Sequence, residues 1–164
     1  MFVAVLLSFS VSGYVLAMLF TSPQTADKFQ EPVIIGEFTV ALDINNVRDL
    51  YAWQAIITYN ASELKIIEIQ PGKFLGVEYP LFLNATDISK GVLLLFGTLY
   101  GDTSTQSGSG RLATIILGYY VEGYEEPKIV LREKHLETYL LDSDGSVIPI
   151  GNPTTLTLTI VENR

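Results

Sequence analysis

Residues 49–76, DLYAWQAIITYNASELKIIEIQPGKFLG, contain two strand patterns separated by a turn. Because side chains of a β-strand alternate between its two faces, the first pattern places one aromatic and aliphatic set on a single face. That set is Tyr51, Trp53, Ala55, Ile57 and Tyr59. Asn60 and Ser62 supply turn chemistry, since their side chains can bond the nearby backbone. An Ile-rich strand follows and ends at Pro71, so the stretch predicts part of a β-sandwich core with Trp53 inside it.

The run YNASELKIIEIQPGKFLG also resembles the cohesin family, whose extracellular β-sandwich modules bind dockerin domains. That family has a Tyr-Asp-Pro turn after its aromatic strand, and Asn60-Ala61 stands in place of the Asp-Pro. Further on, GVLLLFGTLY resembles the family's buried strand, and SGSGRLATIILGYYVEG resembles its small-residue loop and the strand after it. The closing runs LLDSDGSVIPI and TTLTLTIVE resemble its last hairpin. The resemblance covers residues 33–162. It implies an all-β fold, a nine-stranded jelly-roll-like β-sandwich of the type I cohesin kind, over residues 33–164.

Composition agrees with a β-sandwich on independent grounds. The chain has 164 residues, enough for one domain with a sizeable core. Its 13 glycines, 7 prolines and 9 tyrosines favour many strands joined by turns. The absence of cysteine excludes disulfides and thiolate metal sites. A formal net charge of −8 argues against nucleic acid, which is bound mainly through Lys and Arg.

The N-terminal residues 1–20, MFVAVLLSFSVSGYVLAMLF, are apolar, and no charged side chain precedes Asp27. As a helix they would span about 30 Å, the thickness of a bilayer core. They are expected to be a signal peptide or, since a basic n-region is missing, a retained membrane anchor. The alternatives are a buried element of the domain and an assembly segment between subunits. Residues 21–32, with two prolines and little hydrophobicity, are expected to be a linker.

Several further strands are predicted within the domain. Alternation places Phe38, Val40, Leu42 and Ile44 on one buried face. Near the end of the chain it points Thr155, Thr157 and Thr159 outward. Residues 92–96, VLLLF, are apolar without alternation, which predicts a strand covered on both faces. Residues 133–141 carry a helical spacing, but the Asp-Ser-Asp-Gly turn that follows favours a hairpin.

No catalytic or metal-binding constellation can be assembled, so the protein is not expected to be an enzyme or to need a cofactor. The single histidine, His135, lies in a charged run without an orienting partner. Asp142, Asp144 and Gly145 resemble the start of a calcium loop but lack its later oxygen ligands, so a tight turn is favoured over a metal site. Asn60 and Asn84 begin N-glycosylation sequons.

The resemblance to cohesins implies binding through a sheet face that includes the outward side of the aromatic strand. The candidate partner-binding residues there are Ala52, Gln54, Ile56 and Thr58. Ala52 and Gln54 stand where type I cohesins tend to have Asn and Asp, so a dockerin partner would not be the usual one. The expected function is a non-catalytic protein-binding or assembly module, exported and displayed at the cell surface, with a dockerin-like partner or self-assembly.

Two other functions remain open on the sequence. One is a structural subunit of an extracellular filament or pilus, in which residues 1–20 pack between subunits. The other is a carbohydrate-binding module that holds polysaccharide on exposed aromatic rings, for which Tyr119, Tyr120 and Tyr124 are the candidates. A sugar platform requires several rings on one face, whereas adjacent strand residues point to opposite faces.

Overall fold

The computed structural model describes residues 32–76, 81–101, 104–122, 127–132 and 137–163. Residues 1–31, which hold the predicted anchor and nearly all of the predicted linker, lie outside this part, as do Tyr124 and His135. Val33–Arg164 form one compact unit. None of its described residues belongs to a helix long and apolar enough to cross a membrane.

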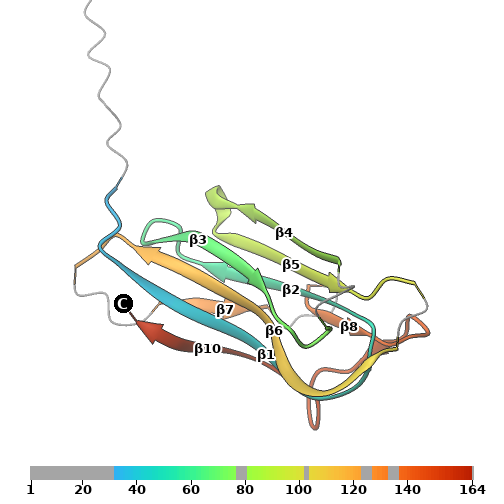
Figure 1. The fold of residues 1–164 in the computed structure, drawn as a ribbon. Coiled ribbons are helices and arrows are strands. Elements are labelled where there is room, and N and C mark those ends of the chain that lie inside the picture. Colours follow the sequence, from blue (N-terminus) through green and yellow to red (C-terminus); the bar gives the residue numbers. More distant parts are fainter. Residues whose placement is uncertain (1–31, 77–80, 102–103, 123–126, 133–136, 164) are drawn as a thin grey trace, which may run out of the picture. The chain divides into compact units, whose positions relative to one another are not determined.

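The described residues form two packed antiparallel sheets, as the sequence predicted (Figure 1). One sheet has the strand order β10-β1-β6-β3, and the other has β4-β5-β2-β8-β9 with β7 also paired to β2. The strands are β1 (Gly36–Leu50), β2 (Ala52–Tyr59), β3 (Leu64–Pro71), β4 (Leu81–Asp87), β5 (Val92–Thr98), β6 (Gln106–Tyr119), β7 (Ile129–Leu131), β8 (Tyr139–Leu141), β9 (Val147–Ile148) and β10 (Thr155–Asn163). One short 3₁₀ helix, η1 (Ile88–Lys90), joins β4 to β5.

The fold class predicted from the sequence is confirmed, although the described residues contain ten strands rather than nine. The difference comes from very short strands: β7 has three residues and β9 has two. The predicted hairpin is β8–β9, in which Leu140 pairs with Ile148. Its turn is held by Asp142, whose Oδ1 accepts hydrogen bonds from the backbone N–H of Asp144 and of Ser146 at 3.0 and 2.7 Å.

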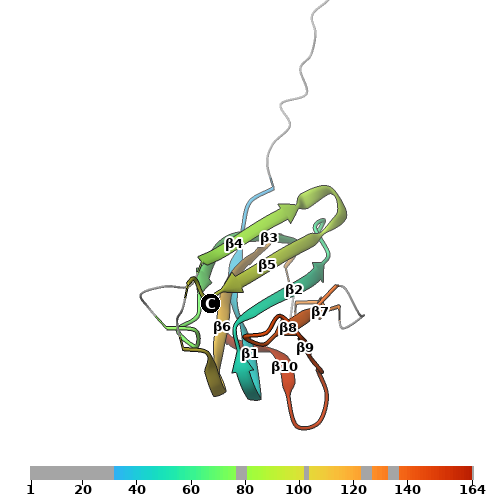
Figure 2. The same ribbon diagram turned by 90° about the vertical axis from the view of Figure 1, so that its right-hand side faces the viewer.

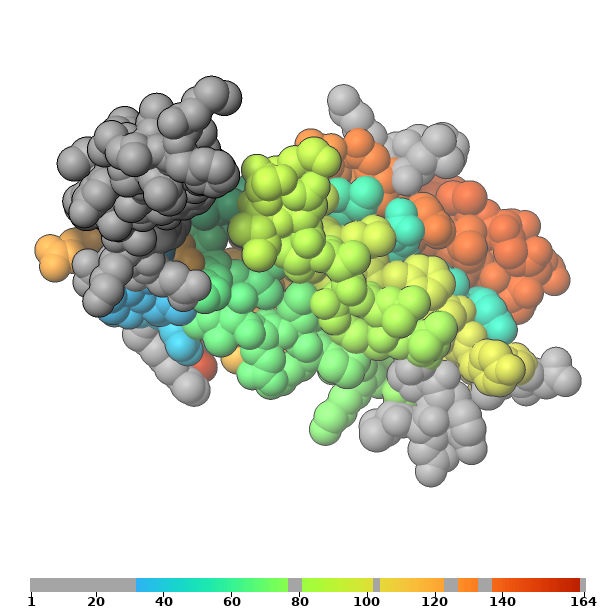
Figure 3. Space-filling model, turned by 90° about the horizontal axis from the view of Figure 1, so that it is seen from above, coloured from blue at the N-terminus to red at the C-terminus, as the bar shows by residue number. Residues whose placement is uncertain are grey.

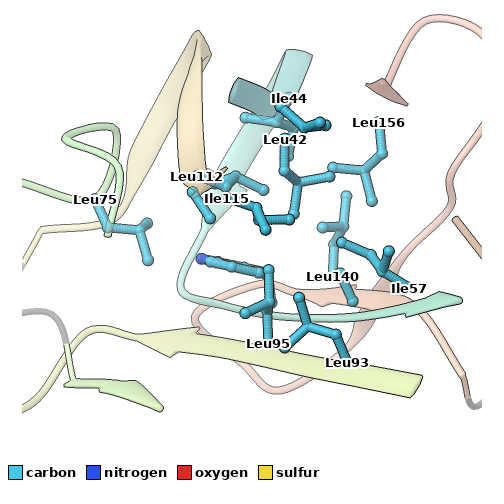
Figure 4. Packing of buried hydrophobic residues seen from close by; sticks show 14 of the residues in the cluster. Leu42, Ile44, Ile57, Leu75, Leu93, Leu95, Leu112, Ile115, Leu140 and Leu156 are labelled. Carbon is cyan, nitrogen blue, oxygen red and sulfur yellow. The ribbon is translucent and has the colours of Figure 1, made fainter. Parts of the chain in front are cut away.

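The core lies between the two sheets and is built by the alternation that the sequence shows. Figure 4 places residues of β1 and β6 over those of β2, β5 and β8. From β2, Trp53 and Ile57 are buried, and from β1 the whole predicted inward set is buried. The predicted outward threonines of β10 are exposed, and Leu156 on the same strand is buried. Every second side chain of these strands therefore points inward, and together these side chains form the two inner faces of the sandwich.

The turn after β2 also forms as the sequence predicted. Asn60 Oδ1 accepts hydrogen bonds from Ser62 N–H at 3.1 Å and from Ser62 Oγ at 2.7 Å. The chain then enters β3, since Leu64 N–H donates to the Asn60 carbonyl at 2.9 Å. This turn carries the chain from the six-stranded sheet to the four-stranded one, because β2 and β3 belong to different sheets.

Candidate protein-binding face

The central strand of the candidate site is β5, whose apolar residues are buried on one side only. Leu93 and Leu95 point into the core and are fully buried, whereas Val92, Leu94 and Phe96 point outward and are half-buried. The expectation that this strand is covered on both faces is therefore wrong for the described residues. The outward side of this strand, which is apolar from Val92 to Phe96, is left partly open to solvent.

Neighbouring strands extend this apolar surface on both sides of β5. Across one ladder, Leu83 of β4 pairs with Phe96, and across the other, Ile56 of β2 pairs with Leu94. Leu81 and Leu83 are 49% and 53% exposed, while Ile56 is half-buried. We name this the apolar face; it consists of Ile56, Leu81, Leu83, Val92, Leu94 and Phe96. Figure 3 looks onto this side of the molecule, with β4 and β5 in lime green and yellow.

The polar residues of β2 lie beside the apolar face and are held in place by their neighbours. Gln54 Nε2 donates to the carbonyl of Glu137 at 3.2 Å, and its Oε1 accepts from the Tyr139 hydroxyl at 3.3 Å. Thr58 Oγ1 lies 3.4 Å from the carbonyl of Val130. Gln54, Ile56 and Thr58 are all half-buried, so the structure brings these three predicted residues together along one side of β2.

Ala52, the fourth residue predicted to bind a partner, is only 5% exposed. Its direct neighbours across the two ladders are Thr98 of β5 and Leu141 of β8. A single methyl group between two larger side chains offers little surface to a partner. We therefore leave Ala52 out of the candidate face, although it lies on the same strand as the other three.

The rim of the apolar face carries an ion pair at the end of β4. Asp87 Oδ2 lies 2.9 Å from Lys90 Nζ, and Asp87 Oδ1 accepts from the Ser89 hydroxyl at 2.6 Å. These hydrogen bonds, from Ser89 first and then from Lys90, lower the pKa of Asp87 to about 2. Asp87 therefore stays ionised and marks a charged boundary next to the apolar residues.

The outer face of the other sheet is polar by comparison. Arg111 Nε and Nη2 donate to both carboxylate oxygens of Asp43, at 2.9 and 3.2 Å, and this pairing raises the pKa of Arg111. Exposed threonines line β10 next to it. A shallow depression nearby is lined by Asp43, Gln70, Pro71, Gly72, Lys73, Arg111 and Thr114. Within the described residues this outer face mixes polar and charged groups with exposed Ile67 and Val161, whereas the face over β4, β5 and β2 carries six apolar residues on adjacent strands.

The tyrosines proposed for sugar binding do not form a common platform among the described residues. The ring of Tyr119 packs against buried Phe38, with centroids 5.0 Å apart, and its hydroxyl covers Gly36. Tyr120 follows it directly, and its backbone N–H donates to the carbonyl of Glu63 at 3.1 Å. Both are half-buried. Tyr119 is therefore engaged in packing across β1 rather than presented to a ligand.

Asn60 and Asn84 are both exposed, and their glycosylation stays a prediction. No group of three or more His, Asp or Glu side chains within the described ranges could hold a metal ion.

Sequence reasoning missed the leucines and the phenylalanine of the apolar face. Leu94 and Phe96 were not named as candidates because residues 92–96 look covered on both faces in the sequence, and Leu81 and Leu83 were not named because their stretch looks like a loop with a short strand. The available signal was the pairing of two apolar runs, LFL and VLLLF, on adjacent strands of one hairpin. Such a hairpin has more apolar side chains than one sheet face can bury.

Known structures resemble this fold, although no protein-family model and no curated protein sequence matches the chain. A type II cohesin from Acetivibrio cellulolyticus, solved in a cohesin–X–dockerin complex, is 17% identical with a TM-score of 0.60, over 73% of this chain and 85% of that one. Type II cohesin A11 from Bacteroides cellulosolvens is 17% identical with a TM-score of 0.58, over 71% and 85%.

A third similar structure is the non-cellulosomal cohesin of the hyperthermophilic archaeon Archaeoglobus fulgidus, which is 16% identical with a TM-score of 0.55, over 72% of this chain and 75% of that one. None of the three is described as a type I cohesin, the type that the sequence resembles. Likeness at these identities establishes the fold. The described part of this chain has the fold of a cohesin module.

Proposed function

We propose that the protein is a non-catalytic binding module that holds a dockerin-like protein on its apolar face. The observation that carries this proposal is the half-open outer side of β5, where Leu94 and Phe96 lie between Ile56 on one strand and Leu83 on the next. Contiguous apolar surface on a sheet, bordered by polar groups, is typical of a protein interface.

The chemistry of the face defines the partner that would fit it. Among its six members there is no charged side chain, and the flanking Gln54 is already hydrogen-bonded within the module. A partner would therefore contribute mainly apolar side chains to the centre and polar groups to the rim. Because one of the similar cohesins was solved with a dockerin, a dockerin-like domain is the partner that we propose.

The same proposal covers location. An apolar segment of 20 residues at the N-terminus would export the module and keep it at the cell surface. The mature N-terminus of native protein, read by mass spectrometry, distinguishes an anchor from a cleaved signal peptide. Retention of residues 1–20 in a membrane fraction supports the anchor, and a mature protein beginning beyond residue 20 contradicts it.

Calorimetric titration with a panel of purified dockerin modules tests the binding proposal. The panel includes the X-dockerin of the Acetivibrio cellulolyticus complex. We expect at least one module to bind, with the negative heat-capacity change that accompanies burial of apolar surface. Leu94→Lys places a charge at the centre of the contact and should abolish that binding, because an unpaired charge would be buried there.

The matched control is Thr157→Lys on the opposite outer face, where the threonine is exposed. It adds the same charge and should leave binding unchanged. Binding by no member of the panel would contradict a dockerin-like partner. Equal loss of binding in both variants would show that net charge, rather than the apolar face, controls the interaction.

A further inference from the structure

Among the described residues, the edge of the six-stranded sheet at β4 has no partner strand along its full length. β4 pairs with β5 on one side, and no described strand pairs with it on the other (Figure 2). Its register with β5 runs from Leu81 opposite Thr98 to Asp87 opposite Val92 without a shift. β4 is therefore a straight, regular edge strand of seven residues.

The backbone groups that face outward from β4 follow from the hydrogen bonds of the neighbouring strands. Leu99 N–H donates to the Tyr51 carbonyl, and Tyr59 N–H donates to the Gly91 carbonyl, each at 2.9 Å. The backbone groups of odd-numbered residues in β2 and β5 thus form hydrogen bonds with each other. Because successive residues of a strand direct their N–H and C=O groups to opposite sides, the even-numbered residues of β5 form their hydrogen bonds with β4. With the printed register, the open edge of β4 presents the N–H and C=O groups of Phe82, Asn84 and Thr86.

β4 also lacks the features that usually protect an edge strand. Exposed edges are commonly blocked by lysine, proline or a bulge, since unpaired backbone groups can join another chain. The edge strand of the other sheet, β3, has Lys65, Pro71 and a register shift between Ile66 and Glu68. β4 reads LFLNATD, with no lysine, proline or register shift, and its only charge is on its last residue.

We propose that β4 pairs with β4 of a second copy of this chain in an antiparallel, two-fold symmetric arrangement centred on Asn84. In this register Asn84 lies opposite Asn84 of the second copy, and Phe82 lies opposite Thr86 of the second copy. Every outward-facing backbone group of one strand then meets its counterpart on the other. Like charges directly opposite each other would destabilise the pairing, but Asp87 lies opposite Leu81 of the second copy.

The pairing has a consequence for the apolar face. The two-fold axis of an antiparallel ladder is perpendicular to the sheet, and paired side chains lie on the same side. The apolar faces of both copies would therefore point in the same direction across one continuous sheet. Two such faces side by side would bind a two-headed partner far more tightly than one face does.

Site-specific disulfide formation tests the register, because the chain has no cysteine of its own. Hydrogen-bonded residues opposite each other have Cα atoms about 5.5 Å apart, within the range of a disulfide. Asn84→Cys should therefore give a covalent dimer on mild oxidation. Thr86→Cys is the matched control on the same strand: its two copies would lie about 13 Å apart along the strand and should not link.

The full chain is used in mild detergent, because residues 1–20 are apolar, and it is produced without N-glycosylation so that position 84 carries no glycan. We expect Asn84→Cys to cross-link at least about tenfold faster than Thr86→Cys, given the two separations. Added salt should increase the rate, since it screens the repulsion between two copies of charge −8. Equal rates at both positions, or no dimer at position 84, would overturn the proposal.

A second variant tests the edge itself. Thr86→Pro in the Asn84→Cys background removes an outward N–H and leaves the bonds between β4 and β5 intact, as proline at an edge does. Cross-linking should fall to the level of the Thr86→Cys control, whereas Thr86→Ala in the same background should retain it. A Thr86→Pro protein that melts like its parent and still cross-links would contradict strand pairing. Dockerin binding by a single module does not depend on these results.

Discussion

The indole ring of Trp53 occupies the space into which a side chain at Gly97 would project. The two residues lie opposite each other on β2 and β5, and a Cβ atom built on Gly97 would lie 2.4 Å from Trp53 Nε1 and 2.7 Å from Cε2. Both contacts are far inside van der Waals distance, and a ring cannot bend away. The largest side chain of the core thus depends on the smallest residue of the adjacent strand.

This contact predicts that Gly97→Ala destabilises the fold by about 1–3 kcal/mol, as overpacking of a core does. Urea denaturation of the variant measures the loss. A double-mutant cycle with Trp53→Leu identifies its cause, because the smaller side chain removes the ring. The cost of Gly97→Ala should largely disappear in the Trp53→Leu background. An unchanged cost there would mean that the backbone of β5, rather than the indole, requires glycine.

Trp53→Ala should cost about 3–5 kcal/mol in unfolding free energy, the usual range for deletion of a large buried aromatic side chain. Trp53 is 2% exposed, and its ring also packs against Phe82, with centroids 6.1 Å apart. Val130→Ala, at a residue that is 59% exposed, is the control and should change stability by less than about 0.5 kcal/mol. Similar melting temperatures for Trp53→Ala and the wild type would contradict a core role.

Asp49 should make the stability of the fold depend on pH in the acid range. Hydrogen bonds from the hydroxyl of Thr105 and then from that of Ser143 lower the pKa of Asp49 from its usual 3.8. A lowered folded-state pKa contributes stability that is present above the unfolded value and is lost as the pH falls through the folded value. The wild type should therefore lose stability below about pH 4 partly through this carboxylate.

The test for Asp49 is a pH series of denaturation midpoints. The substitution Asp49→Asn keeps the left-handed backbone, since asparagine tolerates the φ of 58° found at this position. The variant should be less stable at neutral pH and should show a flatter decline in acid. Asp144→Asn, in the exposed turn between β8 and β9, controls for the general loss of a carboxylate. Parallel pH curves for Asp49→Asn and the wild type would contradict the prediction.

Removal of divalent metal should leave the melting temperature unchanged. The turn between β8 and β9 resembles the start of a calcium loop, yet Asp142 Oδ1 already accepts two backbone N–H groups there. A metal bound only to the folded state would stabilise it by mass action, and a chelator would then lower the melting temperature. A drop of several degrees that added calcium reverses would show a site that the described residues do not reveal.

The inner faces of the sandwich could be predicted because alternation is a property of the sequence itself. Trp53 and Ile57 point inward on β2 and Leu156 does so on β10, as their spacing indicates. The turn at Asn60 and the hairpin through Asp142 also follow from local chemistry, since each is held by side-chain hydrogen bonds to residues two to four positions away.

The apolar face could not be predicted in the same way. An uninterrupted run such as residues 92–96 is compatible with a strand buried on both sides and with one that has a free side. The difference depends on which elements cover the sheet, which is a long-range property. Ala52 shows the same limitation. Alternation along the strand predicts that its side chain points outward, but neighbouring residues of β5 and β8 bury it.

Ile56→Lys should separate partner binding from folding. Ile56 is half-buried on the outer side of β2, beside Leu94. Its hydrogen bonds involve the backbone alone: its N–H donates to Thr138 Oγ1 at 3.1 Å, and its carbonyl accepts from the Arg132 N–H at 2.8 Å. A lysine can extend its ammonium group into water while its stem stays on the apolar surface. The free module should therefore fold with a loss of about 1 kcal/mol or less.

In a complex the same ammonium group would be trapped against apolar residues without a partner, and binding should be lost. Titration of the bound dockerin module into Ile56→Lys measures this loss, and Tyr120→Ala is the comparison on the far side of the sandwich. Tyr120 follows β6 of the other sheet, so its removal should leave affinity unchanged. If Ile56→Lys binds like the wild type while Tyr120→Ala does not, the contact lies near the end of β6, and a ligand held by tyrosines becomes the better explanation.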